Sequence, residues 1–174
     1  MDRIAILGCG GSGKTHLARA LAQQLGLPLT HLDAIYYDTD WNPMPRDEFA
    51  VAQQQLVAQP RWVIEGNYAS TLPVRLAAAD AVVVLDLPAR TCLRGVAQRR
   101  LRHRGGQHKD IGVYDRITWS FIRYILGYRR HRLPQVHRLI GNHAHTAEVI
   151  VLRSRSQIRR FLRDIATQQA VAAT

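Results

Sequence analysis

Lysine is nearly absent from this chain of 174 residues, which has only Lys14 and Lys109 among its 24 basic side chains. The positive charge therefore rests on arginine, whose planar guanidinium matches phosphate oxygens with two parallel hydrogen bonds. Acidic residues are also scarce, at 13, so the formal net charge is +11. This balance favours a partner that carries phosphate, whether a small molecule or a nucleic acid.

Cysteine and long apolar runs are also scarce. Two cysteines, Cys9 and Cys92, provide neither a disulfide framework nor the ligand spacing of a zinc site, which is typical of a reducing cytosol. The first apolar run starts at Ile4 and stops at Gly8, too short for a secretory signal, and no later run reaches the length of a membrane span. We therefore expect a cytoplasmic protein without a membrane partner.

The charge is divided unequally along the chain. Residues 1–89 have six basic and nine acidic side chains, for a net charge of −3, whereas residues 90–174 have eighteen and four, for +14. A cationic half of this kind is compatible with a nucleic-acid surface, or with arginines that close over a polyphosphate. Apolar residues at 47% and charged residues at 21% are ordinary for a globular chain and argue against intrinsic disorder.

Short apolar runs alternate with amphipathic segments, and no repeat or linker divides the chain. This alternation predicts an α/β fold, with a parallel sheet covered by helices on both faces, in a single domain spanning residues 1–174. The stretch 33–44 is expected to be a loop, residues 168–174 a frayed tail, and the apolar residues from Trp119 to Leu126 part of the core. The expected strands are 3–7, 28–32, 62–65, 81–87 and 148–152, and the expected helices are 14–25, 45–59, 90–104, about 114–126, about 134–143 and one from 154.

One motif points to a specific chemistry. Residues 8–15, Gly-Cys-Gly-Gly-Ser-Gly-Lys-Thr, fit the phosphate-binding P-loop pattern G-x-x-x-x-G-K-[ST] and stand between a buried strand and an amphipathic helix. In such a loop, backbone N–H groups turn toward an anion and the helix N-terminus adds partial positive charge. Lys14 would reach the β- and γ-phosphates, and the Thr15 hydroxyl would bind Mg²⁺. The expected nucleotide-binding residues are Gly8, Gly10, Gly11, Ser12, Gly13, Lys14, Thr15 and His16.

Carboxylates come at the ends of the second and third expected strands. We expect them at the same edge of the sheet as the P-loop, where ligands bind in open α/β folds. Asp33, after the second strand, is placed to orient or deprotonate the acceptor of a phosphoryl group and is a candidate catalytic residue. Glu65 ends the third strand and would hold a water bound to Mg²⁺, a role for which Asp86 is an alternative. The residues expected to contact the acceptor are Asp33, Tyr37, Asn67 and Arg75.

The order of these motifs resembles that of adenylate-kinase-like P-loop proteins. After residues 8–15 come His31-Leu32-Asp33, then Trp-Val-Ile-Glu-Gly-Asn-Tyr at 62–68, then Leu-Asp-Leu-Pro at 85–88, an arginine-rich segment, and Val-Ile-Val-Leu-Arg-Ser at 149–154. Among these proteins, the chain looks most like the group called DNA topology modulation proteins. The resemblance covers nearly the whole chain.

This resemblance implies the P-loop nucleoside triphosphate hydrolase fold, with a five-stranded parallel sheet of order 2-3-1-4-5, and it implies ATP and Mg²⁺ as cofactors. It also implies a helical, arginine-rich lid within about residues 95–142. In that lid, Arg100 and Arg104 would flank the adenine or the phosphates of ATP and act in catalysis, and Arg116 would complete it.

The chain departs from the family at one place. Nucleoside monophosphate kinases typically have Asp-Gly-Phe-Pro-Arg where this chain has Glu-Gly-Asn-Tyr-Ala at residues 65–69. The arginine that would bind an acceptor phosphate is therefore missing at residue 69, and Arg75 is the candidate to replace it. This difference leaves the identity of the acceptor open.

Two hypotheses for the function remain. The first is an ATP-dependent kinase that transfers the γ-phosphate to a small-molecule acceptor, either a nucleotide or another metabolite. The second is a nucleotide-regulated nucleic-acid-binding protein that affects DNA topology, in which the +14 half meets the phosphate backbone. Residues 114–143 are compatible with helix-turn-helix geometry, but the chain has no zinc-finger or RRM signature for reading sequence.

Overall fold

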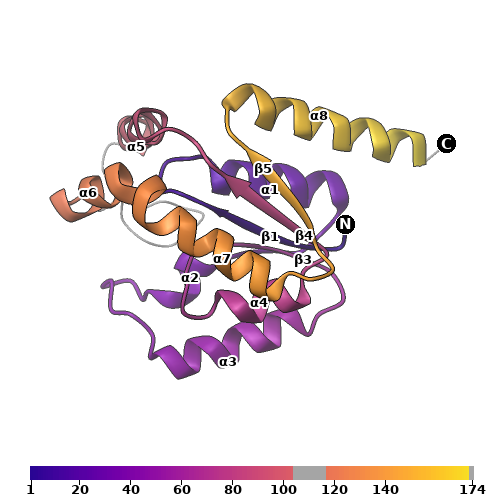
Figure 1. Cartoon of the computed structure of the whole chain (residues 1–174), viewed down its shortest axis with the longest axis horizontal. Helices are drawn as coiled ribbons and strands as arrows, with labels where there is room; N and C mark the ends of the chain where they lie inside the picture. Colours follow the sequence, from indigo (N-terminus) through magenta and orange to yellow (C-terminus); the bar gives the residue numbers. More distant parts are fainter. Residues whose placement is uncertain (104–116, 173–174) are drawn as a thin grey trace.

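The computed structural model describes residues 1–103 and 117–172, and its centre is a sheet of five parallel strands (Figure 1). The strand order is β2-β3-β1-β4-β5, which confirms the predicted order. Strands β1, β3 and β4 are buried on both faces apart from Arg3, so their sequences are continuous apolar runs rather than alternating ones. The strands are β1 (Arg3–Gly8), β2 (Leu29–His31), β3 (Trp62–Glu65), β4 (Ala81–Leu85) and β5 (Glu148–Leu152).

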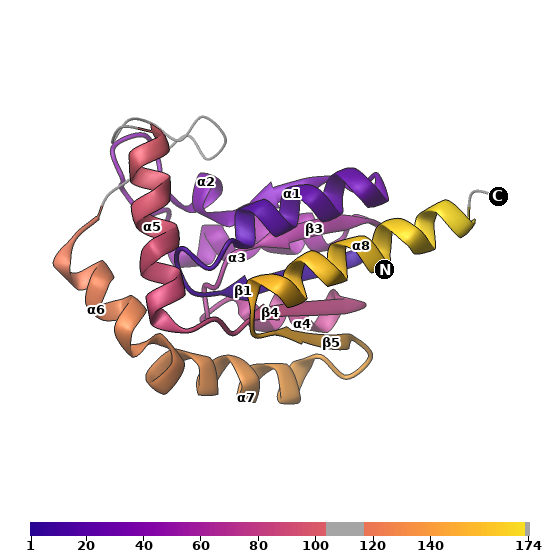
Figure 2. The same cartoon turned by 90° about the horizontal axis from the view of Figure 1, so that it is seen from above.

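Helices cover both faces of this sheet. Helices α1 and α8 pack against each other on one face, and α3, α4 and α7 lie on the other (Figure 1). Helices α5 and α6 lie together at the end of the sheet where α1 begins, as both views show (Figure 2). The helices are α1 (Lys14–Leu25), α2 (Leu32–Tyr36), α3 (Arg46–Val57), α4 (Leu72–Ala78), α5 (Ala89–His103), α6 (Trp119–Gly127), α7 (Leu133–His143) and α8 (Arg155–Ala172), with a π-helix, η1 (Tyr128–Arg132), between α6 and α7.

Several local predictions were wrong. The expected loop at 33–44 begins with the short helix α2, and α4 was not expected. The π-helix η1 joins α6 to α7, so the chain runs without a turn from residue 119 to residue 143. Helix α8 continues to Ala172 instead of fraying from 168.

Helix α6 does not bury all of its apolar side chains. Ile125 is part of the core, but Trp119 is 70% exposed and Leu126 is also exposed, so assigning these two to the core was wrong. In the part of the chain that the structure describes, no helix combines the length and apolarity needed to cross a membrane. The predicted lid includes residues 104–116, which lie outside the described residues, so the lid stays a prediction.

Candidate functional site

The P-loop connects the end of β1 to the first residue of α1. Gly11 and Gly13 have φ angles of 75° and 98°, a left-handed conformation that costs glycine little and other residues more. Gly13 is the N-cap of α1 and provides no side-chain hydrogen bond there, so side-chain capping does not occupy the N–H groups of the first turn. These donors and the partial positive charge of a 12-residue helix form an anion site.

Helix α5 packs directly on this loop. A Cβ atom built on Gly95 would lie 2.1 Å from the Gly11 carbonyl oxygen, and one built on Gly11 would lie 2.2 Å from the Cys92 carbonyl oxygen. Both positions must therefore be glycine for the two backbones to approach this closely. Gly95 is a functional position that sequence reasoning missed, because an isolated glycine in a helical pattern carries no signal of its own.

Lys14 is the first residue of α1, and its ammonium group lies against the loop. The Nζ atom is 3.3 Å from the Cys9 carbonyl oxygen. Its charge is also one of the causes that lower the pKa of Glu65. The expected phosphate-binding lysine is thus held between the backbone of the loop and a carboxylate at the end of β3.

Thr15, Glu65 and His31 meet at the carboxyl ends of the strands. The Thr15 hydroxyl donates to Glu65 Oε1 at 3.0 Å, and His31 Nδ1 lies 2.9 Å from the same oxygen. Glu65 is only 4% exposed. Burial alone would raise the pKa of Glu65, but the hydrogen bonds of His31 and Thr15 and the charges of Lys14 and His31 outweigh it and lower the pKa.

This arrangement fits a Mg²⁺ ion. Mg²⁺ takes oxygen ligands and keeps several of its waters. Because the Thr15 proton points at Glu65, the lone pairs of the Thr15 oxygen remain available to a cation, and the Glu65 carboxylate is placed to accept from its waters. The structure therefore brings together the two residues that the sequence assigned to the metal.

The lowered pKa of Glu65 makes stability depend on pH. The ionised carboxylate stabilises the fold above its ordinary pKa, and this contribution is lost as the pH falls through the lowered value. We expect Glu65→Gln to lower the free energy of unfolding by about 2 kcal/mol at pH 7. The gap to wild type should close as the pH falls through the lowered pKa of Glu65, as measured by urea denaturation. Glu48→Gln on the exposed side of α3 is the control, and a gap that does not change with pH would contradict the assignment.

Asp33 stands exposed in the first turn of α2, immediately after β2. Its Oδ1 accepts a hydrogen bond of 2.6 Å from the Tyr68 hydroxyl. Burial, followed by the charge of Asp33, raises the pKa of Tyr68, so the tyrosine keeps its proton and remains a donor. The pKa of Tyr37 is also raised, by burial first, then by Tyr36 and Asp33.

Asn67 and Arg75 both hydrogen-bond to backbone groups near the P-loop, and the contact with an acceptor expected of Asn67 stays a prediction. Arg75 is completely buried, and its guanidinium donates to the carbonyl oxygens of Gly66 at 2.7 Å and Asn67 at 2.8 Å. The prediction that Arg75 grips an acceptor phosphate is therefore wrong, because its fork is occupied by backbone and closed off from solvent. The Asn67 amide bonds both the N–H and the C=O of Gly8, at 3.0 and 2.8 Å, and so positions the start of the P-loop.

The remaining candidates are Asp86, Arg100 and Arg104. Asp86 forms ion pairs with Arg129 at 2.7 Å and Arg153 at 3.7 Å, which ties β4 to η1 and to the end of β5. These partners give it a structural role, so Glu65 is the better candidate for the metal. Arg100 is exposed on α5, and Arg104 lies outside the described residues, so the roles expected of both arginines stay predictions.

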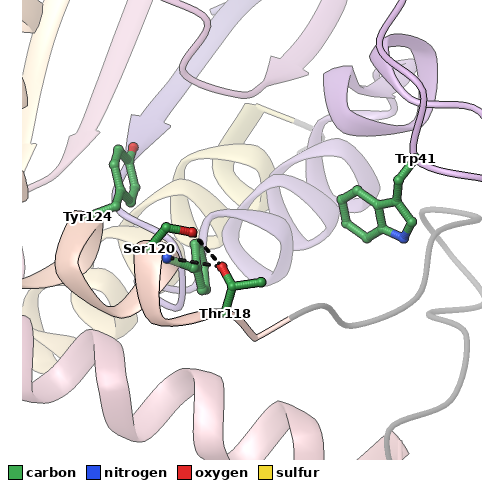
Figure 3. A pocket seen from close by; sticks show the side chains of 5 residues that line it. Trp41, Thr118, Ser120 and Tyr124 are labelled. Atoms are coloured by element: carbon green, nitrogen blue, oxygen red, sulfur yellow. Dashed lines mark hydrogen bonds between the residues drawn. The ribbon is translucent and has the colours of Figure 1, made fainter.

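Two further features, which sequence reasoning missed, lie next to the P-loop. The Arg155 guanidinium, at the start of α8, would lie 3.4 Å from a Cβ atom on Gly13, so a cation stands beside the start of α1. On another side is a pocket of about 540 Å³. Figure 3 shows that its side chains come from two segments far apart in sequence, with Trp41 standing apart from the residues around α6. Among the described residues, Trp41, Thr118, Ser120, Phe121 and Tyr124 line it.

No protein-family model and no curated protein sequence matches this chain. Solved structures do match across nearly its whole length. A shikimate kinase from Acinetobacter baumannii in complex with shikimate is 17% identical, covers 100% of this chain and 95% of its own, and has a TM-score of 0.57. A sugar kinase from Janibacter sp. HTCC2649 is 19% identical with a TM-score of 0.56, covering 95% of this chain and 96% of its own.

A shikimate kinase from Bacteroides thetaiotaomicron is similar at the same level, with 16% identity, a TM-score of 0.52, and coverage of 96% of this chain and 97% of its own. At these identities the likeness concerns the fold. The resemblance to DNA topology modulation proteins stays a prediction. The five-stranded parallel sheet, its strand order and these three structures together show that the chain has the P-loop kinase fold.

Proposed function

We propose that this protein is an ATP- and Mg²⁺-dependent phosphotransferase that moves the γ-phosphoryl group of ATP to a hydroxyl group of a small molecule. The observation that carries the proposal is the shared position of the P-loop and an exposed carboxylate, Asp33, at one edge of the sheet. A phosphate-binding loop alone would serve binding or hydrolysis. A carboxylate beside it provides a base for an acceptor hydroxyl.

The chain's own residues account for the steps of transfer. The N–H groups of the P-loop and Lys14 bind the phosphates, and Thr15 with Glu65 would hold Mg²⁺, which neutralises charge on the β- and γ-phosphates. The acceptor hydroxyl gives its proton to Asp33 while its oxygen bonds to the γ-phosphorus. The bond from that phosphorus to the oxygen shared with the β-phosphate breaks, and ADP leaves with the electron pair.

Tyr68 supports this role for Asp33. Its hydroxyl occupies one carboxylate oxygen at 2.6 Å and so fixes the direction of the group. The second oxygen is then presented to the acceptor. Asp33 is exposed, so an acceptor can reach this second oxygen.

Asp33→Asn is the direct test. We expect kcat for ADP formation with an accepted substrate to fall about 100-fold, because the amide cannot take the proton. The KM for ATP should stay within about twofold, since the hydrogen bond of the Asp33 carboxylate goes to Tyr68 and not to the P-loop. Purified protein, ATP, Mg²⁺ and a panel of hydroxylated acceptors, with ADP release as the readout, give the measurement.

The matched control is Asp164→Asn, which removes an exposed carboxylate from α8, far from the P-loop edge of the sheet. It should leave both constants unchanged. Equal losses in the two variants would contradict the role of Asp33. ADP formation by the wild type that does not depend on any acceptor would point to hydrolysis instead of transfer.

The surplus of arginine is not explained by an ATP site. Arg159, Arg160 and Arg163 are exposed on α8, and this helix has a single carboxylate, Asp164, to balance them. That these arginines bind nucleic acid stays a prediction from the composition.

A further inference from the structure

His31 and Glu65 stand at the ends of two neighbouring strands. The parallel register pairs His31, the last residue of β2, with Glu65, the last residue of β3. Neighbouring strands lie about 4.8 Å apart, so the two side chains start within reach of each other. The residues that follow are also packed together, because a Cβ atom built on Gly66 would lie 2.9 Å from Cβ of the buried Leu32. The two strand ends are therefore held at a fixed separation.

One oxygen of Glu65 receives two hydrogen bonds. Oε1 accepts from the Thr15 hydroxyl at 3.0 Å, and His31 Nδ1 lies 2.9 Å from the same atom. Because Oε1 is the acceptor toward Thr15, we assign the proton of the second bond to Nδ1, which donates. The three residues belong to α1, β2 and β3, so three elements fix the direction of one carboxylate.

The imidazole of His31 is committed to this carboxylate. His31 is also the N-cap residue of α2, but its side chain makes no capping hydrogen bond there. The side chains of His31 and Glu65 are only 11% and 5% exposed. A hydrogen bond shielded from water in this way is electrostatically stronger than one at the surface. The orientation of the carboxylate therefore depends on His31 as well as on Thr15.

The two donors leave Glu65 one oxygen for a further partner. Among the described residues, both side-chain hydrogen bonds of Glu65 are made at Oε1, so Oε2 is the oxygen that can serve a cation or its water. Turning the carboxylate to offer both oxygens to one cation would break the bonds to Thr15 and His31. Glu65 is therefore restricted to a contact through a single oxygen.

This restriction distinguishes between divalent cations. Ca²⁺ takes about six to eight oxygen ligands in flexible geometry and often uses both oxygens of a carboxylate. Mg²⁺ demands octahedral geometry, gives up its waters reluctantly and usually keeps several of them. A single oxygen in a fixed direction suits a cation that keeps its waters, because it can accept a hydrogen bond from one of them. The same arrangement withholds the second oxygen that Ca²⁺ would use.

We infer that His31 is a positioning residue of the metal site, which leaves Oε2 of Glu65 as the oxygen that serves the metal and so makes the site select Mg²⁺ over Ca²⁺. The inference rests on the proposed function, because it concerns the cation that accompanies ATP at the same P-loop. His31 acts through Glu65 and not by contact with the nucleotide. Loss of a partner that orients a metal-binding side chain typically lowers metal affinity by about 10- to 100-fold.

Binding of ATP with different cations tests this inference. Isothermal titration calorimetry gives the Kd for ATP with MgCl₂, with CaCl₂ and with EDTA, and the wild type should bind at least about 10-fold more tightly with Mg²⁺ than with Ca²⁺. In His31→Leu, which removes the donor, the Kd with Mg²⁺ should rise about 10-fold and the Kd with Ca²⁺ less than about threefold. The Kd in EDTA should stay within about twofold, because the N–H groups that bind the phosphates are unchanged. An equal rise under all three conditions would show a purely structural role and overturn the inference.

His31→Asn and His31→Gln form a matched pair. The amide nitrogen of asparagine stands close to the position of Nδ1 and can donate to Oε1, whereas that of glutamine stands one bond farther from the backbone. We expect His31→Asn to restore most of the preference for Mg²⁺ and His31→Gln to lose it. An equal preference in these two variants would contradict the positioning role, even if His31→Leu does not fold. His137→Leu, on the exposed side of α7, is the control and should keep all three values of Kd.

ADP formation separates this inference from the proposed function. A preference for Mg²⁺ that is lost in His31→Gln and kept in His31→Asn, without ADP formation with any acceptor, would refute the phosphotransferase and keep the role of His31. ADP formation that depends on an acceptor, with the same preference for Mg²⁺ in the wild type and in every His31 variant, would refute the role of His31 and keep the phosphotransferase.

Discussion

Replacing Lys14 with methionine is expected to reduce kcat/KM for ADP formation about 1000-fold. Lys14 is the first residue of α1, and its ammonium group lies 3.3 Å from the Cys9 carbonyl oxygen, against the loop that we propose binds the phosphates. Phosphoryl transfer spreads negative charge over the moving group, and a positioned cation stabilises that charge more than it stabilises the ground state. Methionine keeps the length of the side chain and removes the charge.

Steady-state kinetics with ATP, Mg²⁺ and the preferred acceptor measure this effect, and a thermal melt checks that the fold is intact. Arg159→Met is the matched control, because it also replaces a cation with methionine but on the exposed surface of α8. The control should keep wild-type activity. Lys14→Met protein that folds and retains more than about a tenth of the activity would show that the phosphates bind elsewhere.

The largest effect on stability is expected at Arg75. Arg75→Met should lower the free energy of unfolding by about 3 kcal/mol, because the carbonyl oxygens of the buried Gly66 and the half-buried Asn67 would lose their donors. Burial lowers the pKa of Arg75 to about 9, which still leaves the guanidinium protonated at neutral pH and able to donate. Arg75→Lys should rescue little, since an ammonium group cannot bridge the two oxygens as a fork does.

Urea denaturation at pH 7 measures this difference, with Arg61→Met as the control. Arg61 pairs with Asp2 at 2.8 Å, but its side chain is 51% exposed, so its loss should cost less than about 1 kcal/mol. A loss for Arg75→Met no greater than that for Arg61→Met would mean that the oxygens of Gly66 and Asn67 find water instead. Because Asn67 positions Gly8, we expect the Arg75 variant also to bind ATP less tightly.

The phosphate-binding part of the site could be predicted because its signal is local. The glycines, Lys14 and Thr15 are consecutive, and their geometry depends on φ angles and on the start of one helix. Glu65 could also be placed, because a residue at the carboxyl end of a buried strand must lie at the same edge as the P-loop. Its partners, Thr15 and His31, come from neighbouring elements at that edge.

Arg75 shows where such reasoning failed. An arginine near a presumed phosphate site is usually exposed. The residues adjacent to Arg75 in sequence do not indicate that its guanidinium donates to two backbone carbonyl oxygens. The same holds for Gly95, which must be small only because α5 crosses the P-loop. Trp41 and Phe121 are 80 positions apart in the chain, so no local pattern could indicate that they line one pocket.

The sequence by itself determined the α/β class, the succession of buried strands and the phosphate-binding loop, because apolar periodicity and glycine patterns act over a few residues. Only the tertiary structure decided what stands around that loop. It buried Arg75, committed Asn67 to Gly8 and Asp86 to Arg129, and placed Trp41 and α6 around one pocket. These outcomes depend on which elements pack together, and packing joins residues by distance in space rather than by distance along the chain.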